Sequence, residues 1–173
     1  MGTGPAAEAS AAFRADRRLY VVIGLFTSFF AVLFLFVTIK RPERWPILAG
    51  VCGATVALFL CPSRLRLEIT PDTFHYRNLS TSRTEKFSDI DRAYFQTIHS
   101  THTPGGVAAF WIRPKQGKPV KVNLRTFPIE AAAVLFAALD EHGIPIDVPD
   151  TWAARRMARQ IRECQAKLHP GGK

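Results

Sequence analysis

The sequence predicts a membrane-anchored α+β protein with three parts: a transmembrane helical hairpin, a domain of β-strands closed by one helix, and a final amphipathic helix. Three observations predict this fold class. A long uncharged apolar run and a shorter one lie close together near the N-terminus of the 173-residue chain. Short runs with the two-residue alternation of β-strands follow them, and two segments of helical periodicity end the chain.

The first apolar run, residues 20–39, contains no charged residue. At 1.5 Å per residue, a helix of this length covers about 30 Å, the thickness of the hydrocarbon core of a bilayer. The charged segment 40–44 follows, where a signal peptide would have a small-residue cleavage site. We therefore expect a retained transmembrane helix, preceded by a disordered basic segment over residues 1–19.

The second apolar run, residues 46–61, is shorter than a full span. A chain that has just crossed a bilayer must return or stay beside it, so we expect this run to complete a hairpin over residues 20–61. Small residues at Gly50, Gly53 and Ala54 are expected to let its backbone approach the first helix closely.

Basic residues near the two runs indicate the orientation of the hairpin. Those on the side of the termini are Arg14, Arg17, Arg18, Arg64, Arg66 and Arg77, and those in the turn are Lys40, Arg41 and Arg44. Because the basic flanks of membrane helices stay in the cytoplasm, the larger group predicts a multi-pass protein with both termini cytoplasmic.

The composition outside the apolar runs is strongly basic, with a net charge of +9 and a pI of about 10.0. For an anchored domain this charge favours anionic membrane lipid as a partner, and the alternative is that it serves solubility alone. The three cysteines have no paired spacing, so neither a disulfide framework nor a metal site is expected.

Alternating, β-branched and aromatic runs predict a domain of antiparallel strands over residues 63–147. The strands are expected within residues 64–69, 73–78, 80–87, 90–99, 107–114 and 118–125. In the fourth of these, Ile90, Ala93 and Phe95 are expected to face the core, and Tyr94 is a further candidate for an inward position.

Helical periodicity follows the strands over residues 128–143, with Pro128 in the first turn and Gly143 after the last. The apolar face of this helix is expected to hold Ile129, Ala132, Ala133, Phe136 and Leu139.

A second helix is expected over residues 150–169, and it is amphipathic. Its apolar face holds Ala154, Met157, Ile161, Cys164 and Leu168, and its basic face holds Arg155, Arg156, Arg159 and Arg162. Three uses fit such a helix: packing on the domain, lying in the membrane interface, or pairing with a partner helix.

An apolar hairpin that leads into RLRLEITPDTFHYRN, residues 64–78, and then FSDIDRAYF, residues 87–95, resembles the small bacterial pleckstrin-homology (PH) domain membrane proteins. The resemblance covers residues 20–147. It implies a PH-like barrel or sandwich of six to seven strands with a C-terminal helix, a bacterial inner-membrane location, an interaction role and no catalysis. The first strand turn carries Asp72 where phosphoinositide-binding PH domains carry basic residues, so specific phosphoinositide recognition is not expected.

The candidate functional surface lies around the turn between the last two expected strands. Its basic residues are Arg113, Lys115, Lys118, Lys121 and Arg125. Such a surface can bind lipid headgroups or a partner. The alternative is that the lysines protect an edge hairpin from aggregation and that Phe110 or Trp111 belongs to the core.

Other residue groups do not predict a catalytic or metal site. His99 and His102 lack a third ligand, and Asp89 and Asp91 have basic neighbours, so charge balance explains them. We expect no enzyme activity, cofactor, small-molecule substrate or nucleic acid. The expected function is a membrane-anchored scaffold or interaction module that binds protein partners or anionic lipid. The alternative is an accessory subunit of a larger membrane complex. The expected partners are membrane lipids, further copies of the chain or the other proteins of a membrane complex, and a clean homo-oligomer would exclude the subunit function.

Overall fold

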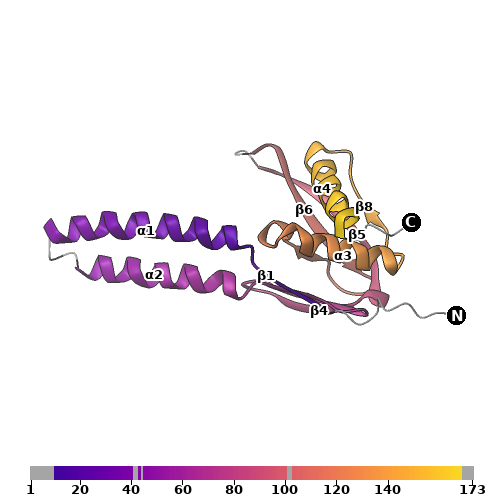
Figure 1. Ribbon diagram of the computed structural model, residues 1–173, viewed down its shortest axis with the longest axis horizontal. Helices are drawn as coiled ribbons and strands as arrows, with labels where there is room; N and C mark the ends of the chain where they lie inside the picture. The colour runs from indigo at the N-terminus through magenta and orange to yellow at the C-terminus, as the bar shows by residue number, and fades with distance from the viewer. Residues whose placement is uncertain (1–9, 41–42, 44, 101–102, 169–173) are drawn as a thin grey trace.

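The computed structural model describes residues 10–40, 43, 45–100 and 103–168. Two helices, α1 (Arg17–Lys40) and α2 (Trp45–Ser63), run side by side in opposite directions and project from one end of the remaining structure (Figure 1). That remainder is an α+β domain with two four-stranded sheets, α3 (Ile129–Glu141) and α4 (Trp152–Leu168). The expected α+β class is confirmed.

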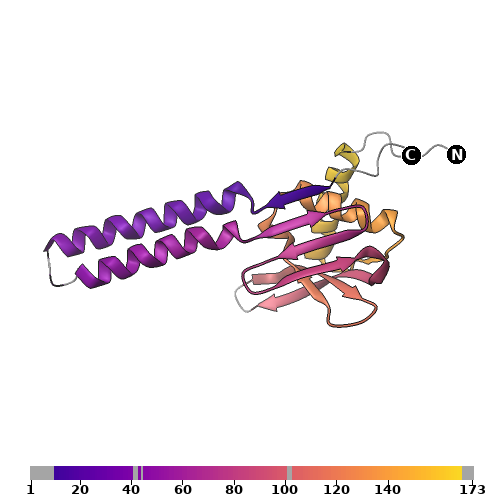
Figure 2. The same cartoon turned by 90° about the horizontal axis from the view of Figure 1, so that it is seen from below.

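Both sheets are largely antiparallel, and Figure 2 shows the first of them in line with the two projecting helices. The first sheet has the order β1-β2-β3-β4, with β1 (Ala11–Arg14), β2 (Arg66–Ile69), β3 (Thr73–Arg77) and β4 (Ser82–Lys86). The second has the order β7-β6-β5-β8, with β5 (Ile90–Ser100), β6 (Thr103–Pro114), β7 (Val120–Val122) and β8 (Ile146–Asp147). The short 3-10 helices are η2 (Phe87–Asp89) and η3 (Leu124–Thr126).

Among the described residues, α1 is the one helix long and apolar enough to cross a membrane. It begins after Asp16, whose carboxylate Oδ1 accepts a hydrogen bond from the backbone N–H of Arg18 at 2.9 Å and caps the first turn. The described apolar stretch of α2, Trp45–Ala57, is too short to cross a membrane by itself. One candidate span is therefore established by length and composition, and the second crossing is not.

The small residues of α2 do not contact α1, so this expectation is wrong. A Cβ atom placed on Gly50 or Gly53 would meet no atom within 4 Å, and Ala54 is exposed. The half-buried residues of the same stretch are Val51 and Thr55. The small-residue face of α2 is consequently open.

Strand β1 is the main element that the sequence did not predict. The disorder expected over residues 1–19 is wrong for residues 11–14, which pair with β2 in the register Ala12 to Glu68 and Phe13 to Leu67. Phe13 also packs against the domain core. The strand before α1 and the strand after α2 are therefore direct neighbours in one sheet.

The inner faces of both sheets share one hydrophobic core with α3. The rings of Phe95, Phe110 and Phe136 meet at its centre, with centroids 5.1 to 6.0 Å apart. A register shift in β5 after Ile90 allows both Ile90 and Ala93 to be buried although they are three residues apart. The inward orientation expected for Ile90, Ala93 and Phe95 is confirmed. The inward position considered for Tyr94 is wrong, because Tyr94 lies between buried Ala93 and Phe95 and therefore faces the other side of the strand.

Helix α3 is buried on a wider surface than the single face that its sequence predicts. Ala131 and Leu135 are buried in addition to the expected positions, whereas Ile129 is 41% exposed. The reason is that α4 also packs on α3, and the buried residues of α4 belong to the same core.

Packing on the domain is the use that the structure assigns to α4. Ala153, Ala154, Ala158 and Ile161 are buried, and the helix contacts α3, β5 and β6. Thr97 and Thr151 share a hydrogen bond of 2.8 Å at its start. Near its end, Arg162 Nη1 donates to Asp140 Oδ2 of α3 at 2.6 Å. Leu168, expected on the apolar face, is 44% exposed.

The docking of α4 predicts a large effect of Ile161→Ala on stability. Ile161 is only 1% exposed, so its truncation leaves a cavity and is expected to lower the free energy of unfolding by about 2–5 kcal/mol. Denaturant unfolding of the full chain in detergent measures this loss. Arg159→Ala, at an exposed position of the same helix, is the control and should change stability by less than about 0.5 kcal/mol. Equal effects of the two changes would contradict the docking.

The pairing of β1 with β2 predicts that cysteines at positions 12 and 68 form a disulfide. Directly opposed residues of antiparallel strands have Cα atoms about 4.5–5.5 Å apart, within the range that a disulfide spans. Ala12→Cys with Glu68→Cys, in a chain with the native cysteines changed to serine, should therefore crosslink on mild oxidation.

The control for this crosslink combines Ala12→Cys with His75→Cys. His75 opposes Glu68 from the far side, on β3, so it lies two strand spacings, about 10 Å, from Ala12, too far for a disulfide. Gel mobility with and without reductant reports the crosslink. If both cysteine pairs crosslink equally, or if neither pair crosslinks, β1 is not held beside β2.

Candidate functional site

The direction of the strands gives the domain two distinct ends. We call the end that joins α1 and α2 the helix-proximal end; β2 starts there, and the turn of residues 78–81 returns to it. The opposite, helix-distal end holds the turn between β2 and β3, where the Asp72 carbonyl accepts a hydrogen bond from the Phe87 N–H at 2.9 Å. These two ends separate the basic residues that the sequence groups together.

Lys115 and Lys118 lie at the helix-distal end. The side chain of Lys115 donates to the Ser88 carbonyl at 2.7 Å, and its backbone N–H donates to the Asp89 carbonyl at 2.7 Å. Both bonds fix the start of the β6–β7 turn beside η2, far from the two long helices (Figure 2). Lys118 is exposed in the same turn.

Lys121 and Arg125 lie toward the helix-proximal end. Lys121 is on β7, and its Nζ atom lies 5.9 Å from the centroid of the Trp111 ring. Arg125, in η3, lines a hollow of about 790 Å³ together with Asp16 and Arg18 at the start of α1. The five basic residues of the predicted surface therefore do not form one cluster.

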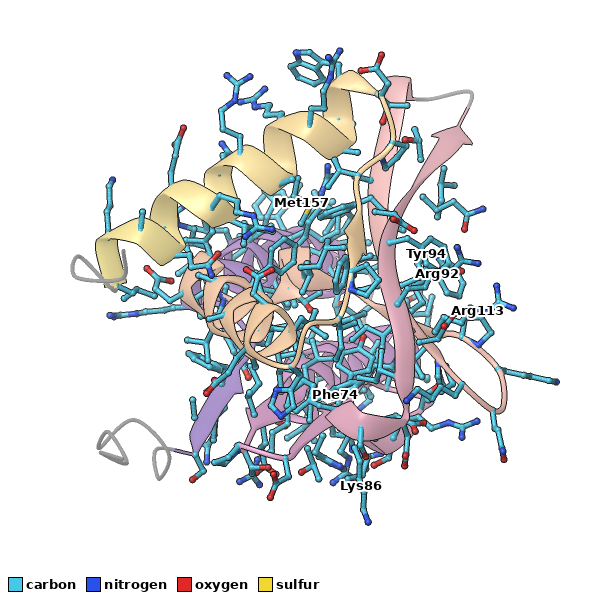
Figure 3. All side chains as sticks on the ribbon, turned by 90° about the vertical axis from the view of Figure 1, so that its right-hand side faces the viewer. Phe74, Lys86, Arg92, Tyr94, Arg113 and Met157 are labelled. Carbon is cyan, nitrogen blue, oxygen red and sulfur yellow. The ribbon has the colours of Figure 1, made fainter. Side chains whose placement is uncertain are left out.

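A different cluster lies on the outer face of the second sheet, and we call it the outer stripe. Its members are Arg92, Tyr94, Trp111, Arg113 and Lys121. In the strand register Arg92 is directly opposite Arg113, and Tyr94 is directly opposite Trp111. Lys121 continues the row on β7, opposite Trp111. Figure 3 shows the side chains of Arg92, Tyr94 and Arg113 gathered on this side of the domain.

The charges of the outer stripe are only partly balanced. Arg92 has two long ion pairs, 3.7 Å to Asp91 and 3.8 Å to Asp147 on β8. Arg113 forms no ion pair within the described part of the chain. Like charges in directly opposed positions of a sheet destabilise it. The opposed Arg92 and Arg113 therefore reduce the stability of the sheet, and they lie on its outer surface beside two aromatic rings.

A shallow hollow of about 480 Å³ adjoins the outer stripe. It is bounded by Arg92, Tyr94 and Arg113 on one side, and on the other by Asp147 of β8 and the two residues after it, Val148 and Pro149. The alternative that Phe110 belongs to the core is confirmed, since it is 1% exposed. Trp111, on the opposite face of β6, is half-buried.

The basic face of α4 is largely engaged by neighbouring side chains of the same chain. Arg155 pairs with Asp150 at 2.8 Å, and the Arg156 guanidinium lies 5.0 Å from the centroid of the exposed Trp152 ring. Arg162 binds Asp140 as described above. Arg159 is exposed. This face consequently offers less free charge than its sequence predicts.

The remaining candidates form no reactive cluster. No group of three metal-ligating side chains occurs in the described residues. The Ser88 hydroxyl donates to Asp89 Oδ1 at 3.2 Å, and Asp91 pairs with Arg92. His102, Arg41 and Arg44 lie outside the described residues, as does the side chain of His99.

The sequence contained a signal for the outer stripe that only the strand register makes visible. Arg92 and Tyr94 alternate on one expected strand, and Trp111 and Arg113 alternate on the next. Both pairs lie on the outward positions, so they meet if the two strands pair in this register. The register depends on the bulge after Ile90, which periodicity alone does not reveal.

Comparison of the chain with protein-family models, with curated proteins and with solved structures finds no match.

Proposed function

We propose that this protein is a membrane-anchored interaction module with a PH-like domain, at the cytoplasmic face of a bacterial inner membrane. Both α1 and α2 cross the membrane in this proposal. The outer stripe binds an acidic segment of a protein partner, and the protein acts by binding rather than by turnover.

The two-crossing anchor is supported by the pairing of β1 with β2. A chain that leaves the domain through α1 must come back to the strand beside β1, because β2 follows α2 directly. If α1 spans a bilayer, α2 is the segment that returns. A helix of 19 residues covers about 28 Å, close to the thickness of the hydrocarbon core. Removal of α1 as a signal sequence would also remove β1 from its sheet.

The cytoplasmic orientation is supported by the charge of the helix-proximal end. Arg14, Arg64, Arg66 and Arg77 all lie at the ends of strands or helices that meet there, and basic residues next to membrane helices favour the cytoplasmic side. The core that two largely antiparallel sheets share with α3 supports the PH-like part of the proposal.

The observation that carries the proposed function is the Arg92 and Arg113 pair beside Tyr94 and Trp111. Tyr, Trp and Arg dominate the binding energy of protein interfaces because they combine large contact area with directed hydrogen bonds. Two opposed guanidinium groups without full neutralisation are stabilised when carboxylates are added. An acidic partner segment supplies those carboxylates.

A protein partner suits the helix-distal lysines better than anionic lipid does. A strand of five residues, such as β3, separates the two ends of the first sheet, and at about 3.3 Å per residue this is roughly 15 Å. Attraction between exposed charges in physiological salt is screened over about 8 Å. In the proposed orientation, Lys115 and Lys118 are therefore too far from the leaflet to contribute to lipid binding.

The accessory-subunit function remains a second candidate because of one observation. Gly50 and Gly53 leave the outer face of α2 open, and small residues on a transmembrane helix allow close packing of a neighbouring helix. A membrane partner would be expected to pack on this face.

The proposed partner surface predicts that Arg113→Glu abolishes stable association. Charge reversal at the centre of such an interface is expected to cost at least about 2 kcal/mol, or roughly 30-fold in affinity. Purification of the full chain in mild detergent, with quantification of the co-purifying protein, measures the loss.

The matched control is Arg83→Glu, at an exposed position on β4 of the other sheet. It makes the same change of charge away from the outer stripe and should leave association intact. Equal loss with both variants, or retention with both, would refute the outer stripe as the binding surface. Recovery of the chain as a homo-oligomer without any other protein would refute both the acidic protein partner and the accessory-subunit function.

The proposed topology predicts that an impermeant thiol reagent modifies Cys164 only after the inner membrane is permeabilised. Burial raises the pKa of the Cys164 thiol, and the nearby Glu130 carboxylate raises it further. Since the thiolate is the reactive form, its modification should accelerate with pH up to a higher pH than that of an ordinary cysteine. Cys164→Ser is the control, and equal labelling of intact cells would contradict the orientation.

A further inference from the structure

A groove of about 550 Å³ lies where α1 and α2 join the domain. Leu19 and Ile23 of α1 form one wall, and Leu79, in the turn between β3 and β4, forms the rim. The opposite side is polar and includes Lys121 and Asn123 at the end of β7. The groove therefore changes from apolar to cationic across its width.

The apolar wall of the groove continues along the outer surface of α1. Val22 and Phe26, one and two turns into the helix, are 63% and 64% exposed. Side chains of this kind on a membrane-spanning helix contact acyl chains. An acyl chain lying against α1 can therefore extend into the groove without leaving an apolar surface.

Leu79 is an exposed hydrophobic residue at a position that its turn holds firmly. The side-chain oxygen of Asn78 accepts hydrogen bonds from the N–H groups of Ser80 and Thr81 at 2.9 and 2.7 Å. This arrangement orders the turn while leaving Leu79 57% exposed at the helix-proximal end. A leucine in that position is stabilised by contact with lipid rather than water.

The cationic side of the groove is suited to a phosphate group. Lys121 is exposed beside the ring of Trp111, and it forms no ion pair within the described residues. Asn123 is exposed beside it and offers a side-chain amide. A lysine close to a membrane surface attracts anionic lipid by an amount equivalent to about a five-fold change in affinity.

We propose that this junction groove binds one anionic phospholipid, with an acyl chain against Leu19 and Ile23 and the phosphate beside Lys121. The inference rests on the membrane anchor of the proposed function. Lys121 also ends the outer stripe, but Arg92 and Arg113 carry the partner proposal, so the lipid site does not depend on the protein partner. A soluble anion would use Lys121 but would leave the apolar wall exposed to water. A phospholipid satisfies both sides of the groove at once.

Native mass spectrometry of the full chain tests this proposal. The protein is reconstituted with equal parts of phosphatidylglycerol and phosphatidylcholine, released into mild detergent, and examined for retained lipid. The wild-type chain should retain one phosphatidylglycerol. Lys121→Gln should weaken retention about five-fold, whereas Lys118→Gln, at the helix-distal end, should not change it.

A second variant tests the apolar rim. Leu79→Asp places a carboxylate at the mouth of the groove and should abolish retention of phosphatidylglycerol. Because Leu79 is exposed, thermal unfolding of the Leu79→Asp variant should match that of the wild type. The control is Val148→Asp, which changes another exposed apolar residue outside the groove and should retain the lipid.

Three outcomes separate this inference from the proposed function. Unchanged retention in both Lys121→Gln and Leu79→Asp overturns the groove alone, and equal retention of the two lipids overturns its preference for anionic lipid. Recovery of the full chain in the soluble fraction overturns the membrane anchor and the lipid site together. Loss of partner binding by Arg113→Glu has no bearing on lipid retention.

Discussion

The arrangement of the whole chain depends on the pairing of β1 with β2. These strands flank the helical segment on its two sides, and their backbone hydrogen bonds hold its entry and exit next to one another. The two helices are therefore an insertion between neighbouring strands of one sheet. Two covalent connections and the bond from the Asp16 N–H to the Thr126 carbonyl, 2.9 Å long, then fix the direction in which the helices project.

This fixed direction explains why the positive charge of the chain serves different surfaces. Successive strand ends lie at opposite ends of the domain. Residues close in sequence, such as Lys118 and Lys121, therefore lie at different distances from the helix-proximal end, and the difference is comparable to the distance over which salt screens charges. In the proposed orientation the helix-proximal arginines lie next to a leaflet, and the outer stripe lies on a sheet face between the two ends. Net charge alone indicates an anionic partner but not how many surfaces contact one.

The sequence predicts the elements in which the pattern of apolar and polar residues follows directly from which side chains are buried. The alternation of β2, β3 and β5 and the apolar run of α1 are of this kind. It does not predict β1, because its four residues are stabilised by pairing with a strand more than fifty positions away. The open face at Gly50 and the outer stripe likewise depend on helix rotation and strand register, which only tertiary contacts determine.

The two proposed functions, anchored module and subunit, use two surfaces that the fold keeps apart. The outer stripe lies on the second sheet, and the face with Gly50 and Gly53 lies on α2 beyond the helix-proximal end. Because the β1–β2 pairing holds the helices and the domain in a fixed relation, a partner that occupies one surface does not cover the other. A membrane protein with an acidic segment outside the bilayer can therefore contact both. In that case a single partner binds both surfaces, and the anchored-module and subunit functions are the same function. The β1–β2 pairing then sets the distance between the outer stripe and the α2 face that the partner must span.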